Sequence, residues 1–138
     1  MRFDDMIATV LAQPAGPPDR RGVRWRQLVD LLAQRRERDP DERARAFDFL
    51  REHRGLVEAD MRRETARTLA GLSVEPDLLA FFAEDAPSVA AALIAGARLD
   101  ADGWLAVVPR LRPAARSLLR HRRDLPGEVR AALGAFGP

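Results

Sequence analysis

Residues 124–133 read DLPGEVRAAL, and residues 85–93 read DAPSVAAAL. Both stretches place a proline two residues after an aspartate, and both space a valine and a leucine four residues apart. Proline is favoured in the first turn of a helix, and a four-residue spacing puts two side chains on one helix face. Residues 61–71, MRRETARTLAG, repeat the stretch 124–133 more loosely, with Met61 in place of the valine before an arginine and a leucine close to a glycine at the end. The repeated pattern predicts short helices that each bury one face against a neighbour.

The surrounding sequence extends this pattern from residue 75 to the C-terminus. Pro76, Pro87, Pro113 and Pro126 each stand near an expected helix start, and three aspartates are candidate N-caps: Asp85, Asp100 and Asp124. We expect helices at about 76–84, 87–98, 101–108, 113–122 and 126–136. No run of β-branched residues alternates with polar ones, so no strand is expected. The fold class predicted is all-α, with at least seven helices packed as antiparallel pairs from about residue 40.

The N-terminal part predicts longer helices. An amphipathic helix within residues 1–13 is followed by a linker at 14–19, which contains three prolines and a glycine. A second helix is expected from about 20 to 38. Asp39-Pro40-Asp41-Glu42 is a strong helix start, with Asp39 as cap and Glu42 at the capping-box position. The third helix ends near Gly55, and a fourth runs from Leu56 to about Gly71. All 138 residues are expected to form one domain, with a helical extension at 20–56 and the repeats at 57–138.

The composition excludes several classes of site. Of 138 residues, 46% are apolar and 32% charged, which is typical of a globular chain. All 23 basic residues are arginine, and the chain has no Cys, Lys or Asn. Disulfides, zinc–thiolate sites and a P-loop are therefore excluded. No apolar stretch is long enough for a transmembrane helix, and the N-terminus is acidic where a secretory signal is basic. We expect a cytoplasmic protein.

Residues that could perform chemistry are few. His53 and His121 are the only histidines, and neither has the sequence context of a kinase phosphoacceptor, so both are interpreted as partly exposed helix-end residues. No ligand cluster suggests a metal, and no serine has a nucleophile-elbow context. The sequence thus predicts no enzyme activity, no cofactor and no metal. Arginine clusters at 35–38, 62–67 and 116–123 leave nucleic-acid binding open as the alternative, although acidic residues lie between them.

Apolar spacing predicts the core and the interaction surfaces. Trp25 and Trp104 are expected in the core. The repeat positions expected to be nearly fully buried are Val89, Leu93, Leu118, Val129 and Leu133. Adjacent helix residues point about 100° apart, so one of Phe81 and Phe82 is expected near a groove or interface. The candidate interaction surface is Phe81, Phe82, Arg116, Arg120 and Arg123. The first helix must dock its apolar stripe either on its own domain, by folding back across the linker, or on a neighbouring subunit. We expect the second arrangement, a homodimer with the candidate contacts Phe3, Met6, Ile7, Val10 and Leu11.

Residues 57–137 resemble an alphaproteobacterial domain of unknown function built from HEAT-like repeats. The resemblance is carried by Asp85, Val89, Ala90, Ala97, Arg98, Leu99, Trp104, Leu105, the stretch 120–126, Val129 and Leu133. The whole chain is also similar to the segment before the PAS and kinase modules of soluble sensor histidine kinases in sphingomonad-type bacteria. This resemblance implies a HEAT-like helical array and a role in bacterial signalling. We expect a non-catalytic regulatory or sensory module that binds a protein partner or a neighbouring signalling module.

Overall fold

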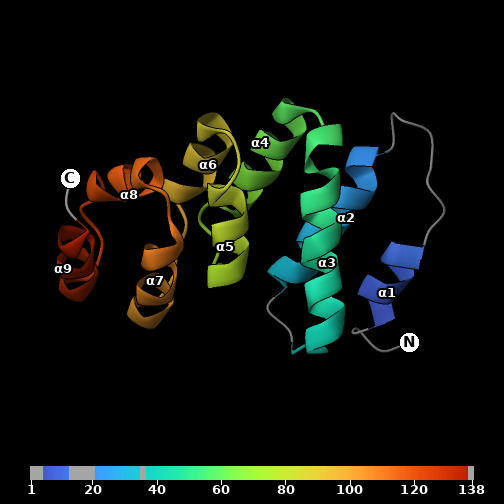
Figure 1. The fold of residues 1–138 in the computed structure, drawn as a ribbon, viewed down its shortest axis with the longest axis horizontal. Coiled ribbons are helices and arrows are strands. Elements are labelled where there is room, and N and C mark those ends of the chain that lie inside the picture. The colour runs from blue at the N-terminus through green and yellow to red at the C-terminus, as the bar shows by residue number, and fades with distance from the viewer. Residues whose placement is uncertain (1–4, 13–20, 35–36, 137–138) are drawn as a thin grey trace. The chain divides into compact units, whose positions relative to one another are not determined.

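The computed structural model describes residues 5–12, 21–34 and 37–136, which are predominantly helical (Figure 1). In chain order the elements are α1 (Asp5–Ala12), α2 (Arg21–Ala33), α3 (Pro40–His53), the 3-10 turn η2 (Arg54–Leu56), α4 (Ala59–Leu69), α5 (Pro76–Ala83), α6 (Pro87–Ile94), α7 (Ala101–Val107), the 3-10 turn η3 (Val108–Arg110), α8 (Pro113–Arg120) and α9 (Gly127–Ala135). The described residues contain no strand, only an isolated bridge between Ser73 and Arg98. The predicted all-α class is confirmed for this part of the chain.

The helix starts follow the sequence closely, with two exceptions. Asp39 caps α3 by accepting a hydrogen bond from Glu42 N (3.1 Å), and Asp100 caps α7 by accepting one from Gly103 N (2.7 Å). Asp85 and Asp124 do not occupy the N-cap positions, so these two predictions are wrong. The N-cap positions of α6 and α9 are the residues directly before the first helical turn, which are Ala86 and Pro126.

The chain divides into two compact units, residues 1–65 and 66–138, and the boundary falls within α4. In unit 1 (residues 1–65), α1, α2 and α3 pack against one another around the buried Trp25. The Trp25 indole Nε1 donates a hydrogen bond to the carbonyl oxygen of Leu50 near the end of α3 (3.1 Å). Gly22 permits a close approach, because a Cβ atom there would lie 2.0 Å from the Met61 sulfur.

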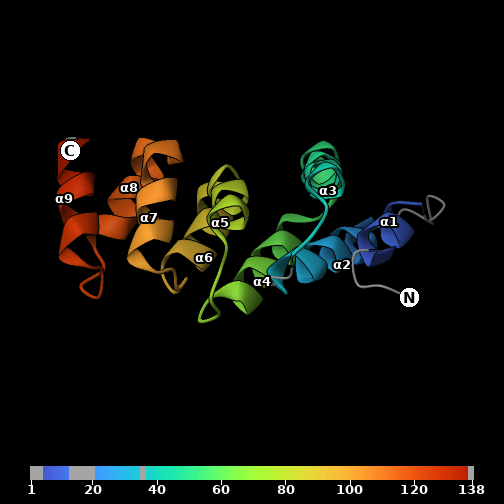
Figure 2. The same cartoon turned by 90° about the horizontal axis from the view of Figure 1, so that it is seen from below.

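In unit 2 (residues 66–138) the short helices alternate between two layers. Figures 1 and 2 place α5, α7 and α9 side by side in one layer and α6 and α8 in the other. The elements recur with a regular period, since α7 begins 25 residues after α5 and α8 begins 26 residues after α6. The loops after α4 and α6 pair through Gly71 N to Gly96 O and Val74 N to Arg98 O, each 2.9 Å. Gly71 has a φ of 91°, a left-handed conformation that favours glycine after a helix end.

The core of unit 2 confirms four of the five predicted buried residues. Val89, Leu93, Val129 and Leu133 are at most 2% exposed. Leu118 is only partly buried, and this prediction is wrong. Its neighbour on α8, Leu119, is fully buried instead, because it follows Pro113 by six residues just as Leu93 follows Pro87. Adjacent helix positions point about 100° apart, so one residue of register decides which leucine enters the core.

Candidate functional site

Arginine side chains in unit 1 hydrogen-bond carbonyl oxygens at helix ends. Arg24 Nε donates to Val10 O in the last turn of α1 (3.0 Å), and the same guanidinium donates to Leu11 O. Arg38 donates to Leu31 O in the last turn of α2 (2.6 Å). The last four carbonyls of a helix lack intrahelical partners, so these charged donors satisfy groups that the helix leaves open.

Arg122 does the same in unit 2, where it donates several hydrogen bonds. Its Nη1 donates to Ile94 O (3.0 Å) and Ala97 O (2.7 Å), which lie at and just beyond the end of α6. Its Nε and Nη2 bind the two carboxylate oxygens of Asp124 (2.9 and 2.7 Å). The guanidinium carbon also lies 5.3 Å from the centroid of the Trp104 ring. Arg122 therefore ties the loop before α9 to the end of α6.

The bidentate contact changes the acidity of Asp124. The hydrogen bond from Arg122, together with the positive charge of that guanidinium, lowers the pKa of the Asp124 carboxyl to about 2. Asp124 is otherwise exposed, with 67% of its side-chain surface accessible. The pair is thus fully ionised at neutral pH, and Arg122 shares its charge with a permanent carboxylate.

The three arginines predicted as an interaction surface have different roles. Arg116 donates to Leu111 O, and its guanidinium carbon lies 4.7 Å from the centroid of the Phe136 ring. Arg120 Nη2 donates to Leu133 O in the last turn of α9 (2.9 Å). Arg123 is exposed, and its carbonyl oxygen rather than its side chain makes a contact. Of the three, Arg120 lines the pocket between α8 and α9.

That pocket has a volume of about 230 Å³ and lies between α8, the loop that follows it, and α9. It is lined by three leucines, three arginines and a glycine: Leu119, Leu125, Leu133, Arg120, Arg122, Arg130 and Gly134. All three leucines are buried, whereas Arg120 and Arg130 are exposed. The pocket therefore has an apolar floor and a cationic rim. Figures 1 and 2 both show α8 and α9 next to each other at the C-terminal side of unit 2.

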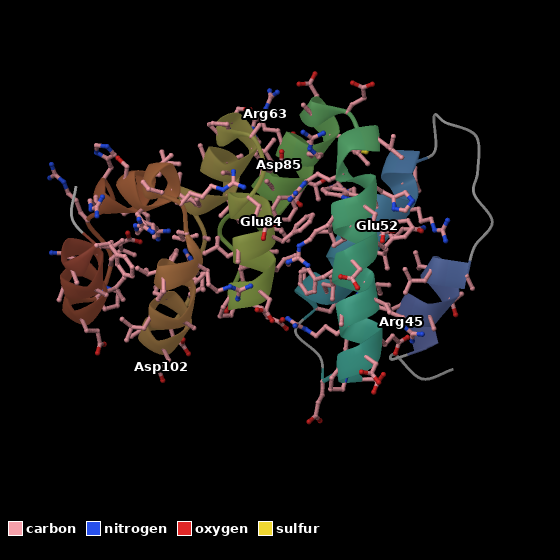
Figure 3. All side chains as sticks on the ribbon, in the orientation of Figure 1. Arg45, Glu52, Arg63, Glu84, Asp85 and Asp102 are labelled. Atoms are coloured by element: carbon pink, nitrogen blue, oxygen red, sulfur yellow. The ribbon has the colours of Figure 1, made fainter. Side chains whose placement is uncertain are left out.

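Sequence reasoning found Arg120 but missed Arg122 and Arg130 as members of one site. The distribution of charged residues along the sequence could have indicated this site. Residues 66–102 carry two arginines and six carboxylates, whereas residues 103–138 carry seven arginines and two carboxylates. Figure 3 labels three of the six carboxylates, Glu84 and Asp85, which follow α5, and Asp102, which lies on α7. Unit 2 is thus acidic in its first half and basic in the half that forms the pocket.

Phe81 and Phe82 are not part of an interaction surface. Both side chains are fully buried, and their rings meet edge to face with centroids 5.2 Å apart. The prediction that one of them lies near a groove or interface is wrong. It assumed a helix with one narrow buried face, whereas α5 is buried from Leu78 to Ala83 because it packs against both α6 and α7.

The other candidate residues lie in ordinary structural surroundings. His53 is half-buried and stacks on Phe49, with ring centroids 3.9 Å apart, while His121 is exposed just after α8. Both match the interpretation as helix-end residues. Trp25 and Trp104 lie in the core as predicted, at 0% and 2% exposed. In the described part of the chain, no three His, Asp or Glu side chains gather in a way that could hold a metal ion.

The first helix docks on its own unit. Ile7 and Val10 are buried at 0% and 8% exposed, Met6 and Leu11 are partly buried, and α1 packs against α2 and α3. Glu42, predicted at the capping-box position of α3, instead accepts a hydrogen bond from Ala8 N of α1 (2.8 Å). Phe3 lies outside the described residues. The homodimer stays a prediction, because an exchanged α1 would form the same contacts on a second copy.

The arginine cluster at 62–67 also makes local contacts. Arg62 donates to Arg54 O (3.1 Å) and to Val57 O at the 3-10 turn η2. Arg63 pairs with Asp60 one turn earlier on α4 (2.7 Å). Of the cluster at 35–38, residues 35 and 36 lie outside the described ranges. These contacts give the arginines a structural use that does not require a phosphate backbone.

Among the described residues, no helix combines the length and the apolar character needed to cross a membrane. Comparison with known proteins adds no relative: no family model matches the chain, and no curated protein and no solved structure is significantly similar to it.

Proposed function

We propose that the chain is a non-catalytic regulatory module of bacterial signal transduction that binds another protein, and that it serves as the input region of a sensor histidine kinase. The observation that carries this proposal is the pocket between α8 and α9, in which guanidinium groups surround an apolar floor. Such a combination of apolar anchor site and polar rim is common at the centre of protein interfaces. The resemblance of residues 57–137 to HEAT-like repeats supports the same conclusion, since arrays of this kind present binding surfaces.

The contacts of Arg122 suggest how binding would be transmitted within unit 2. Arg122 lines the pocket and also holds the carbonyl oxygens of Ile94 and Ala97 at the end of α6. A partner group that competes with Asp124 for Arg122 would reorient the guanidinium and loosen or tighten the end of α6. The pocket and a second helix are therefore linked through one side chain.

The proposal is tested with signalling modules encoded in the same reading frame or operon. The immobilised chain is exposed to a histidine-kinase core, a PAS module, a receiver module and duplex DNA, and binding is measured by biolayer interferometry. We expect one of the signalling modules to bind and duplex DNA not to bind. Binding of DNA alone, with a strong dependence on salt, would favour the alternative of a nucleic-acid-binding helical repeat.

Absence of catalysis is a separate prediction. The chain has no Lys or Asn and no phosphate-binding glycine loop, so it should not bind ATP. Isothermal calorimetry with Mg-ATP should give no binding heat, and incubation with labelled ATP should leave His53 and His121 unmodified. Phosphate incorporation at either histidine without an added kinase would contradict the proposal.

A further inference from the structure

We propose that the pocket between α8 and α9 binds an acidic peptide segment in which one apolar side chain is flanked by carboxylates. This inference rests on the proposed function, for which it specifies the chemistry of the partner. The apolar side chain would enter between Leu119, Leu125 and Leu133, and the carboxylates would meet Arg120 and Arg130 at the rim.

The size of the pocket favours a side chain over a separate small molecule. Sites for drug-sized ligands and cofactors have volumes of about 300–1,000 Å³. The present pocket, at about 230 Å³, is smaller and open at a rim where Arg120 and Arg130 are both exposed. A volume of this size suits one or two side chains of a polypeptide whose backbone remains outside.

The rim arginines are held in place before any ligand arrives. Arg120 donates to Leu133 O (2.9 Å), and Arg130 donates to Arg123 O (2.5 Å). A guanidinium has five N–H donors in a planar fork, so a single carbonyl contact leaves Arg130 able to bind a carboxylate through two further donors. Anchored arginines lose less conformational entropy on binding than free ones, which favours recognition of a carboxylate.

The charge around the pocket is complementary to an acidic partner. The pocket belongs to the half of unit 2 that carries seven arginines and two carboxylates, and one of these carboxylates, Asp124, already pairs with Arg122. Single-stranded nucleic acids are also anionic, but their binding sites combine charge with aromatic side chains on which bases stack. The lining of this pocket has leucines and no aromatic ring. The observations therefore favour an acidic, partly apolar peptide.

Gly134 provides a direct way to close the pocket. It lines the pocket from α9, and a Cβ atom added there meets no heavy atom within 4 Å. Gly134→Ala should leave the fold intact because alanine is favoured over glycine in helices. Gly134→Leu adds a larger side chain at the same position and should fill the space above the floor.

The experiment measures fluorescence anisotropy of a labelled short peptide with a leucine flanked by glutamates. Two control peptides replace the leucine by serine or the glutamates by glutamine. We expect Arg130→Gln to weaken binding about tenfold or more, as for loss of a charged hydrogen-bonded contact. Gly134→Leu should weaken it at least as strongly.

The control variant Arg112→Gln should have no effect on peptide binding, because Arg112 is an exposed arginine at the opposite end of α8. Circular dichroism confirms that each variant is folded, and Gly134→Ala serves as the conservative variant.

Several results would overturn the inference. The inference is overturned if the acidic apolar peptide does not bind, or if either control peptide binds as tightly as it does. Binding that survives both Arg130→Gln and Gly134→Leu would place the peptide elsewhere. Competition by duplex DNA at lower concentration than the peptide would assign the rim to phosphates.

Failure of the inference can be distinguished from failure of the proposed function. If a signalling module still binds the Gly134→Leu variant with unchanged affinity, the inference fails and the proposed function stands. If no module binds even the unmodified chain, the proposed function fails.

Discussion

The two units of the chain reach a buried core by different means. In unit 1, α2 and α3 have 13 and 14 residues, whereas the five helices from α5 to α9 in unit 2 have seven to nine. A helix of fewer than about 12 residues is marginal in water by itself. The helices of unit 2 therefore depend on layer packing and on side chains that satisfy their ends, and a single core or capping side chain should matter more there.

Arginine illustrates the same contrast. In unit 1, Arg24 and Arg38 bind the last-turn carbonyls of helices and line no described pocket. In unit 2, Arg120 and Arg122 bind carbonyls in the same way and also line the pocket between α8 and α9. In unit 2, a contact that stabilises a helix end thus also places a charged group at the pocket.

The largest effect is expected from truncating the centre of unit 2. Phe82→Ala should lower the free energy of unfolding by about 3–5 kcal/mol, because a fully buried aromatic ring leaves a cavity. Trp104 reports on unit 2 and Trp25 on unit 1, so urea unfolding followed in Trp25→Phe and Trp104→Phe backgrounds separates the units. We expect the Trp104 signal to shift. An unchanged midpoint would mean that Phe82 is not a core residue.

A matched pair on α8 tests the helix register. Leu119→Ala should cost about 2–5 kcal/mol, since Leu119 is fully buried, whereas Leu118→Ala at the partly buried neighbouring position should cost about 1 kcal/mol or less. Thermal and urea unfolding of both variants measure the difference. The reverse order of the two effects would restore the sequence-based assignment of Leu118 to the core.

Substitution of arginine by lysine tests the role of the planar fork. Arg122→Lys should destabilise by about 1.5–3 kcal/mol, because an ammonium cannot reach two carbonyls and both oxygens of Asp124 together. Arg24→Lys in unit 1 should cost less, about 1 kcal/mol, because Arg24 donates to two carbonyl oxygens and lies over the Phe49 ring, whereas Arg122 binds two carbonyls and a carboxylate. Urea unfolding of the two variants gives the comparison. Equal, negligible costs would show that these contacts are incidental.

The smallest effect concerns pH. The pKa of Asp124 is lowered from its usual 3.8 to about 2 by Arg122, so the ion pair contributes stability above about pH 4 and loses it as the pH falls through 2. A carboxyl-carbon NMR titration should give a midpoint near 2 for Asp124, and in Arg122→Lys the midpoint should move toward 3.8. Because Asp124 is exposed, the change in overall stability should be slight. An unchanged midpoint in the variant would exclude the bidentate pair in solution.

Local features of the sequence were sufficient to predict the helices and many of the buried residues. Pro40, Pro76, Pro87 and Pro113 each stand in the first helical turn, and Asp39 and Asp100 cap as expected, because caps and proline act over a few neighbouring residues. Apolar spacing likewise predicted that Val89, Leu93, Val129 and Leu133 are buried. These properties depend on the geometry of one helix at a time.

The tertiary structure decided what periodicity within one helix could not. Phe81 and Phe82 are both buried because α5 has neighbours on more than one side, and Leu119 rather than Leu118 is the α8 leucine that enters the core. Arg120, Arg122 and Arg130 share a pocket only because α9 folds back beside α8. Sequence spacing determines which side chains share a helix face. Which face meets which neighbour depends on how all the helices of a unit pack together. The same packing decides which carbonyl oxygens the long arginine side chains can reach.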